Sequence, residues 1–246
     1  MNTIIPFSHP MYIMLKPAGS LCNLRCKYCY YLEKSKLYDN NKNHVITDAL
    51  LEKFVKEYIE AQTTPQVLFT WHGGETLMRP ISFYRRALEL QRYYGRGRQI
   101  DNSIQTNGIL LNDEWCRFFK ENNFLVGVSI DGPQEFHDEY RRNAMGKPSF
   151  HQVMKGINLL NKHGVEWNAL AVVNDFNADY PLDFYHFFKE IGCRYIQFTP
   201  IVERIVNRED GLTLAPGMQE GGELTDFSVT AEQWGNFLCT IFDEWV

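Results

Sequence analysis

The chain has 246 residues, of which 44% are hydrophobic and 14% aromatic, enough to bury a sizeable core as one domain. Its formal net charge of −5 and a pI near 5.8 argue against a general nucleic-acid or membrane-surface binder. The sequence has no apolar run of ~20 residues and no signal-peptide pattern, so its six cysteines lead us to expect a cytoplasmic protein with metal or thiol chemistry.

Strands and helices are predicted to alternate along the chain. Apolar runs predict six strands, at 12–16, 67–71, 103–106, 124–130, 166–173 and 195–198. Amphipathic patterns predict helices at 45–61, 81–93, 113–121, 150–163 and 182–191. This alternation indicates β-α units with a parallel sheet. It does not distinguish a partial (β/α)6 barrel from an open doubly wound sheet, but in both the ligand site lies at the carboxyl ends of the strands.

Three cysteines follow the first predicted strand: Cys22, Cys26 and Cys29. With gaps of three and two residues, one short loop is able to place three thiolates around a single compact inorganic group. Thiolates are the ligands of iron–sulfur clusters and zinc. Zinc requires a fourth ligand, and no second Cys/His pair is evident; a disulfide framework suits small secreted domains. The spacing therefore favours an iron–sulfur site, and a four-iron cluster would keep one iron open.

Polar or glycine-rich segments follow the next strands. Gly73 and Gly74 let backbone approach a ligand closely, and Glu75 beside them suits an ammonium group. Residues 105–108, Gln-Thr-Asn-Gly, suit ribose hydroxyls, and Ser129 with Arg141 suits a carboxylate. Each segment alone is also typical of an ordinary turn. Their occurrence at successive strand ends predicts one ligand site.

These motifs resemble those of radical S-adenosylmethionine (radical SAM) enzymes. Four segments are most similar to the anaerobic sulfatase-maturating enzymes: residues 22–34 (CNLRCKYCYYLEK), 71–75 (WHGGE), 129–133 (SIDGP) and 230–246. The resemblance implies the partial (β/α)6 barrel. It also implies a [4Fe–4S] cluster held by Cys22, Cys26 and Cys29, whose open iron binds SAM.

The resemblance also implies residue roles. SAM contacts are expected from Tyr28 and Val202 along the adenine, Gly73, Gly74 and Glu75 at the amino group, Thr106 and Asn107 at the ribose, and Ser129 and Arg141 at the carboxylate. Tyr31 and His72 are expected to border the substrate. At the position of His72, some relatives have Gln.

The implied reaction oxidises one Cys or Ser of a sulfatase precursor to Cα-formylglycine. In the family, SAM is cleaved to methionine and a 5′-deoxyadenosyl radical, which removes a hydrogen from the β-carbon of the target side chain. The expected partners are the sulfatase polypeptide and a one-electron reductant such as a flavodoxin or ferredoxin. Related enzymes carry two auxiliary [4Fe–4S] clusters and the proposed general base in a cysteine-rich C-terminal (SPASM) domain, expected to lie beyond Val246.

We expect a core at 1–202, a connector at 203–229 and, at 230–246, a helix opened by a Thr230–Gln233 capping box and truncated before the SPASM domain. From these residues we predict SAM binding and uncoupled SAM cleavage, with weak or absent maturation. The alternatives are another radical SAM peptide-modifying maturase or, in a different class, an iron–sulfur electron carrier or a zinc-stabilised binding module.

The remaining cysteines and most histidines are predicted to have ordinary structural roles. Cys116, Cys193 and Cys239 lie in apolar surroundings along the sequence, and we expect them to be buried. The histidines at 9, 44, 137, 151, 163 and 186 have no partner at metal-ligand spacing.

Overall fold

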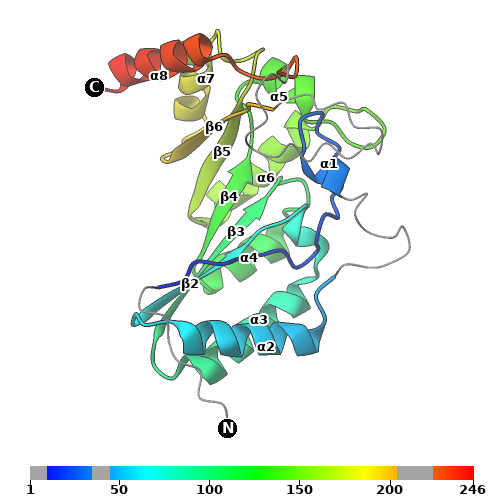
Figure 1. Cartoon of the computed structure of the whole chain (residues 1–246), viewed down its shortest axis with the longest axis vertical. Helices are drawn as coiled ribbons and strands as arrows, with labels where there is room; N and C mark the ends of the chain where they lie inside the picture. The colour runs from blue at the N-terminus through cyan, green and yellow to red at the C-terminus, as the bar shows by residue number, and fades with distance from the viewer. Residues whose placement is uncertain (1–9, 35–44, 204–223) are drawn as a thin grey trace. The chain divides into compact units, whose positions relative to one another are not determined.

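The computed structural model describes residues 10–34, 45–203 and 224–246 (Figure 1). Its strands are β1 (Met14–Leu15), β2 (Gln66–Trp71), β3 (Gln99–Thr106), β4 (Phe124–Ser129), β5 (Trp167–Val173) and β6 (Ile196–Pro200). Its helices are α1 (Tyr31–Lys34), α2 (Asp48–Ala61), α3 (Ile81–Gly95), α4 (Asp113–Glu121), α5 (Gln134–Tyr140), α6 (Phe150–His163), α7 (Pro181–Glu190) and α8 (Ala231–Trp245), with a short 3₁₀ helix, η2 (Thr76–Met78).

The strands form a six-stranded sheet in chain order, from β1 to β6. Neighbouring strands run parallel, with Met14 opposite Thr70, Gln66 opposite Gln99, and Ala169 opposite Ile196. The predicted α/β class with six strands and intervening helices is therefore confirmed. Each predicted site segment follows the carboxyl end of its own strand.

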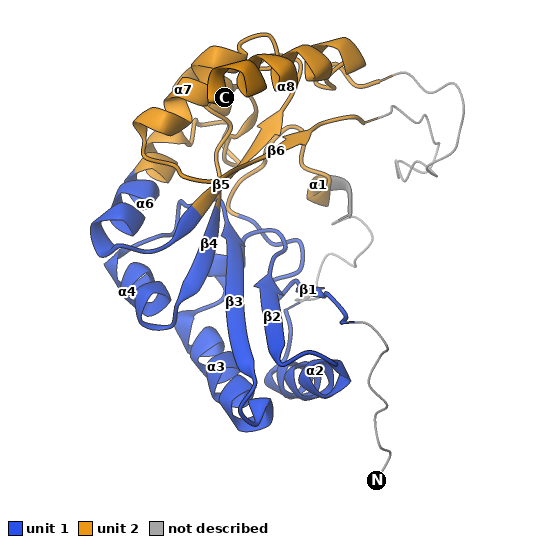
Figure 2. Ribbon diagram, turned by 90° about the vertical axis from the view of Figure 1, so that its left-hand side faces the viewer, with its two compact units in different colours: residues 1–22, 43–127, 155–167 blue, residues 23–42, 128–154, 168–246 orange. Residues whose placement is uncertain are grey.

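The chain divides into two compact units, drawn in blue and orange in Figure 2. Unit 1 comprises residues 1–22, 43–127 and 155–167, within which β1, β2, β3, α2, α3 and α4 are described. Its core is aromatic: Trp71 packs edge-to-face on Tyr84, which packs on Trp115 in turn. The indole Nε1 of Trp71 donates to Asn102 Oδ1 (2.9 Å), so the ring is buried with its polar atom satisfied.

Unit 2 comprises residues 23–42, 128–154 and 168–246. Phe184 of α7 packs against Phe198 of β6 and Phe237 of α8, and both Phe184 and Phe237 are fully buried. Helix α8 begins with the predicted capping box: Gln233 N–H donates to Thr230 Oγ1 (3.1 Å), and Thr230 N–H donates to Gln233 Oε1 (3.0 Å). That prediction is confirmed.

Some predictions lie outside the described residues or were wrong. Residues 204–223 of the expected connector, and the histidines at 9 and 44, lie outside the described part. Cys116 is fully buried as expected, whereas Cys193 is half-buried and Cys239 is exposed. Cys239 faces outward because the buried stripe of α8 runs through Phe237 and Ile241. Helix α5 was not predicted.

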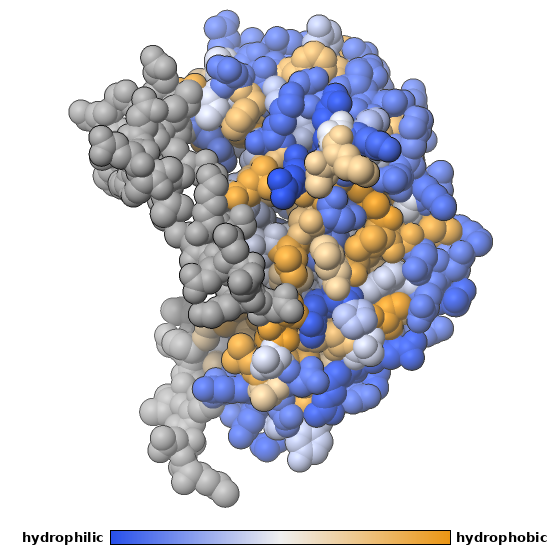
Figure 3. Space-filling model, turned by 90° about the vertical axis from the view of Figure 1, so that its right-hand side faces the viewer, coloured by the Kyte–Doolittle hydropathy of each residue, from blue (hydrophilic) through white to orange (hydrophobic). Residues whose placement is uncertain are grey.

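None of the helices within the described ranges is long and apolar enough to span a membrane. Large apolar side chains are nonetheless exposed at several places, among them Met14, Leu21 and Tyr30. Figure 3 shows hydrophobic residues in the middle of one face, with hydrophilic residues around them. Singly exposed apolar side chains are ordinary on a folded protein.

Candidate cofactor site

The cysteine loop supplies three thiols, none of which is in a disulfide. Cys26 is buried, and Cys22 and Cys29 are half-buried. A tight turn follows Cys26, because Cys29 N–H donates to Cys26 O (2.9 Å). Within the described ranges no group of three His, Cys, Asp or Glu side chains is arranged to hold a metal ion. The donors, three thiols within eight residues, fit thiolate ligation of an iron–sulfur cluster by their chemistry.

In unit 1, the two glycines after β2 receive the start of the cysteine loop. Gly74 N–H donates to Gly19 O (2.9 Å), and Glu75 N–H donates to Leu21 O (2.7 Å). A Cβ atom on Gly74 would lie only 2.2 Å from Leu21 O. The close approach predicted for these glycines therefore includes the chain's own backbone, immediately before Cys22.

Glu75 joins the ends of β2 and β3. Its carboxylate is fully buried and accepts from Thr106 Oγ1 (2.7 Å), Asn107 N–H (2.7 Å) and Leu77 N–H (2.9 Å). Burial raises the pKa of Glu75, and these three hydrogen bonds oppose that rise. These contacts give Glu75 a structural role. Its contact with the SAM amino group remains a prediction.

Asn107 directs its amide toward the cysteine loop. Its Oδ1 accepts from Ile109 N–H (3.1 Å), which fixes the orientation of the amide, and its Nδ2 donates to Cys22 Sγ (3.7 Å). Gly156 of α6 packs closely against the segment that follows Asn107, since a Cβ on Gly156 would lie 2.3 Å from Gly108 O. Gly156 carries no signal in the sequence beyond being a glycine inside a helix.

His72 follows β2 and is half-buried. Its Nδ1 accepts a hydrogen bond from Gly73 N–H (2.8 Å). Burial lowers the pKa of His72, and the nearby Lys16 cation lowers it further. We therefore expect the ring to be neutral at pH 7, with its lone pair on Nδ1 accepting from Gly73 N–H and its proton on Nε2.

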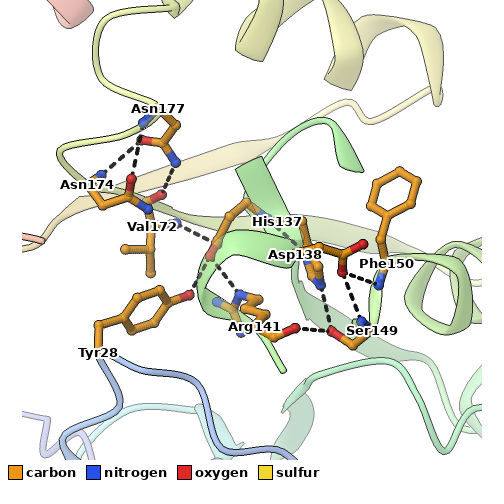
Figure 4. Close-up of polar contacts among 10 residues, drawn as sticks. Tyr28, His137, Asp138, Arg141, Ser149, Phe150, Val172, Asn174 and Asn177 are labelled. Atoms are coloured by element: carbon orange, nitrogen blue, oxygen red, sulfur yellow. Dashed lines mark hydrogen bonds and ion pairs between the residues drawn. The ribbon is translucent and has the colours of Figure 1, made fainter. Parts of the chain in front are cut away.

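In unit 2, Tyr28 and Arg141 meet on one carboxylate, that of Asp131, which is fully buried. Tyr28 Oη and Arg141 Nε both donate to Asp131 Oδ2, the latter at 2.8 Å (Figure 4). The Arg141 guanidinium also lies over the Tyr28 ring, 5.5 Å from its centroid. Burial holds the pKa of the Tyr28 phenol well above its usual value, and the Asp131 anion raises it further against the Arg141 cation.

The second half of the cysteine loop lies along the segment that ends α5. Arg25 N–H donates to Arg142 O (2.7 Å), and Lys27 N–H donates to Tyr140 O (3.0 Å). Lys27 Nζ also pairs with Glu139 Oε1 at 2.7 Å. This pairing places Tyr28 beside Arg141, although the two lie far apart in sequence.

The other predicted site residues of unit 2 are Tyr31, Ser129 and Val202. Tyr31 is buried and its ring packs on Tyr30, with 4.3 Å between centroids. Ser129 is half-buried at the end of β4, and Val202 is exposed after β6. Sequence reasoning gave no role to Asp131, although Asp131 stands within the quoted segment 129–133; its partners became visible only in the fold.

The chain is similar to known proteins along its whole length. The family model described as the radical SAM superfamily matches residues 17–188. The whole chain is 73% identical to the serine-type anaerobic sulfatase-maturating enzyme of Bacteroides thetaiotaomicron and covers 59% of it. It is 36% identical to the cysteine-type enzyme of Clostridium novyi, over 95% of this chain and 59% of that relative.

A solved structure described as native anSMEcpe with bound AdoMet and Cp18Cys peptide has a TM-score of 0.80 and 31% identity to this chain. The match covers 95% of this chain and 59% of that one. The chain thus spans about three-fifths of the length of these relatives.

Proposed function

The chain belongs to the radical SAM superfamily, and from that membership we propose that it acts in anaerobic sulfatase maturation, oxidising one residue of a sulfatase precursor to Cα-formylglycine. The observation that carries the proposal is 73% identity, over the whole chain, to a serine-type sulfatase-maturating enzyme. Identity to the cysteine-type enzyme of Clostridium novyi is 36%. We therefore propose serine as the target residue.

The proposed metal ligands are Cys22, Cys26 and Cys29. Their thiols, none in a disulfide, fit a [4Fe–4S] cluster with one iron left for SAM. When bound, the cluster and SAM supply one-electron cleavage of SAM and removal of a hydrogen atom from the substrate. Asn107, which donates to Cys22 Sγ, stabilises negative charge on that sulfur.

We propose SAM contacts within each unit, taken separately. In unit 1 they are Gly73, Gly74 and Glu75 at the amino group and Thr106 and Asn107 at the ribose. In unit 2 they are Ser129 and Arg141 at the carboxylate, and Tyr28 and Val202 along the adenine. Arg141 is the best supported of these contacts, because a buried guanidinium is suited to bind a carboxylate.

The redox chemistry belongs to the cofactors, and the side chains of the protein bind and orient the substrate and the cofactors. We propose that Tyr31 and His72 border the substrate. With its lone pair accepting from Gly73 N–H, His72 would present Nε2–H to the substrate as a hydrogen-bond donor. Because the lone pair of His72 is occupied in this way, we propose that another group removes the hydroxyl proton of the substrate. A flavodoxin or ferredoxin is the proposed electron donor, and the cytoplasm is the proposed compartment.

The test uses a serine peptide carrying the sulfatase modification sequence, incubated anaerobically with reconstituted protein, SAM and dithionite. With a protein of the relatives' full length we expect 5′-deoxyadenosine and loss of two hydrogen atoms at the serine by mass spectrometry. With residues 1–246 alone we expect 5′-deoxyadenosine and weak or absent loss of these atoms. A matched peptide with alanine at that position should keep its mass. SAM cleavage without any change in the serine peptide, by the full-length protein, would contradict the assigned substrate.

A further inference from the structure

Asp131 of unit 2 is a buried carboxylate to which none of the sequence motifs described above assigns a role. It accepts hydrogen bonds from three other residues of that unit. Its Oδ2 accepts from Tyr28 Oη and from Arg141 Nε (2.8 Å), and its Oδ1 accepts from Val172 N–H (2.9 Å). Its own N–H donates to His137 Nδ1 (3.3 Å). Figure 4 shows these hydrogen bonds converging between Tyr28, Arg141 and Val172.

Arg141 uses only one edge of its guanidinium in these contacts. Its side chain is 9% exposed, and Nε pairs with Asp131. Its two terminal nitrogens have no hydrogen-bond or ion-pair partner among residues 10–34, 45–203 and 224–246. A buried guanidinium with one edge paired and the other open is suited to bind a carboxylate through two parallel hydrogen bonds.

Tyr28 connects the same carboxylate to the cysteine loop, since it lies between Cys26 and Cys29. Backbone hydrogen bonds from Arg25 and Lys27 already hold the loop along residues 140–142. The Tyr28–Asp131 hydrogen bond adds a side-chain contact between the loop and the buried interior of unit 2.

The backbone of Arg141 is held from another direction. Its carbonyl accepts from Ser149 Oγ (2.7 Å), and His137 Nε2 hydrogen-bonds the same hydroxyl (2.9 Å). Ser149 N–H in turn donates to Asp138 Oδ1 (2.9 Å). The backbone and Nε of Arg141 are thus fixed by separate contacts, and the hydrogen bond to Asp131 is the contact that fixes Nε.

We propose that Asp131 is a positioning residue that orients Arg141 toward the SAM carboxylate and Tyr28 within the cysteine loop. This inference rests on the proposed function, because it takes SAM as the ligand of Arg141. Asparagine at this position keeps the shape but loses the charge. Its NH₂ group would also face a donor, either Val172 N–H or the Arg141–Tyr28 pair. The expected consequence is weaker SAM binding with the cluster still assembled.

The experiment measures SAM affinity on anaerobically reconstituted protein by calorimetry, with iron and sulfide counted in every sample. Asp131→Asn should weaken SAM binding on the order of tenfold or more. Asp175→Asn is the matched control: Asp175 also accepts from a buried tyrosine hydroxyl, Tyr140 Oη at 2.6 Å, but it pairs with no arginine in the described part of the chain. That control should bind SAM like the wild type.

A double-mutant cycle separates positioning from general damage. If Asp131 acts through Arg141, then Arg141→Gln weakens SAM binding, and adding Asp131→Asn changes it by no more than about twofold. The double variant also avoids leaving a single buried charge, which destabilises a fold. Tyr28→Phe, which keeps the ring and the Asp131–Arg141 pair, should give a smaller loss of SAM affinity at full cluster content.

Each outcome decides. Wild-type SAM affinity in Asp131→Asn, or losses that add in the double variant, would overturn the positioning role while the proposed function stands. If the Asp131→Asn protein does not retain its cluster, the Tyr28→Phe variant decides: SAM affinity equal to that of the wild type would then overturn the positioning role. If the wild-type holoprotein itself does not bind SAM, the proposed function fails, and the role of Asp131 fails with it.

Discussion

The amide of Asn107 donates from Nδ2 to the sulfur of Cys22, with 3.7 Å between the two atoms, while its Oδ1 accepts from Ile109 N–H. This hydrogen bond places a donor on a proposed cluster ligand. Donors to cluster sulfurs favour the reduced, more negative cluster, and so raise its reduction potential.

We therefore expect Asn107→Ala to lower the midpoint potential of the reconstituted cluster, and Asn107→Asp to lower it further by adding negative charge. Potentiometric titration followed by electron paramagnetic resonance gives the value. Asn122→Ala is the control, because Asn122 Nδ2 donates to a backbone carbonyl, Phe118 O at 2.8 Å. A potential unchanged in both Asn107 variants would show that the N–H···S contact does not tune the cluster.

Gly74 has no room for a side chain, and we predict that Gly74→Ala prevents stable cluster incorporation. The added Cβ would meet Leu21 O at 2.2 Å, so the start of the cysteine loop must move. Overpacking of this kind destabilises a fold by about 1–3 kcal/mol. Iron content per chain and thermal unfolding are the measurements.

Gly235→Ala is the comparison for that variant. Gly235 lies in α8, and a Cβ added there would have no described atom within 4 Å, so alanine should stabilise the helix by about 0.5–1 kcal/mol and leave iron content unchanged. Normal iron content in Gly74→Ala would show that the loop tolerates displacement.

His72 is predicted to be neutral at pH 7 with its proton on Nε2. Gly73 N–H occupies the lone pair of Nδ1, and burial lowers the pKa of the ring. Nitrogen-15 chemical shifts of the imidazole distinguish the two tautomers, and His72→Gln assigns the signal by its loss. A proton on Nδ1, or a ring that titrates above its ordinary pKa, would refute the donor role proposed for His72.

His137 predicts an acid-sensitive stability. Burial lowers its pKa to about 4, and Arg141 acts in the same direction, against the opposing effect of Asp131 and Asp138. The neutral form is favoured in the folded state, so the stabilisation is complete above the unfolded pKa of about 6.5 and is lost as pH falls toward about 4.

The expected loss is about 3 kcal/mol over that range, from the difference between the two pKa values. Urea unfolding of the wild type and of His137→Asn, at pH 7, 6 and 5, gives the difference in slope. The variant should be less stable at pH 7 but should lack this part of the decline. Parallel curves for the two proteins would contradict a neutral buried His137.

The sequence predicted the alternation of strands and helices because most elements carry a clear apolar period. Helix α4 was predicted with its observed bounds, Asp113–Glu121. Strand β3 begins at Gln99, four residues before its prediction, because its first half is polar. Asn102 is buried there through hydrogen bonds with Trp71 and Gln91, and no local pattern reveals such long-range partners.

The site was predictable as segments but not as contacts. The cysteine loop and the residues after β2, β3 and β4 were found from spacing and resemblance. Helix α5 was not predicted, because it has only seven residues and its apolar pair, Phe136 and Tyr140, is too little to reveal a helical period. The role of Asp131 depends on partners at positions 28, 141 and 172, which only the folded chain brings together.

The most direct test of the central claim is an electron paramagnetic resonance spectrum of the anaerobically reconstituted, dithionite-reduced protein, recorded with and without SAM. We predict a four-iron signal whose g-values shift when SAM is added, because three cysteine ligands leave one iron open. A variant with Cys22, Cys26 and Cys29 all replaced by alanine should give no such signal. A four-iron signal indifferent to SAM would mean a closed cluster and would contradict the proposed function.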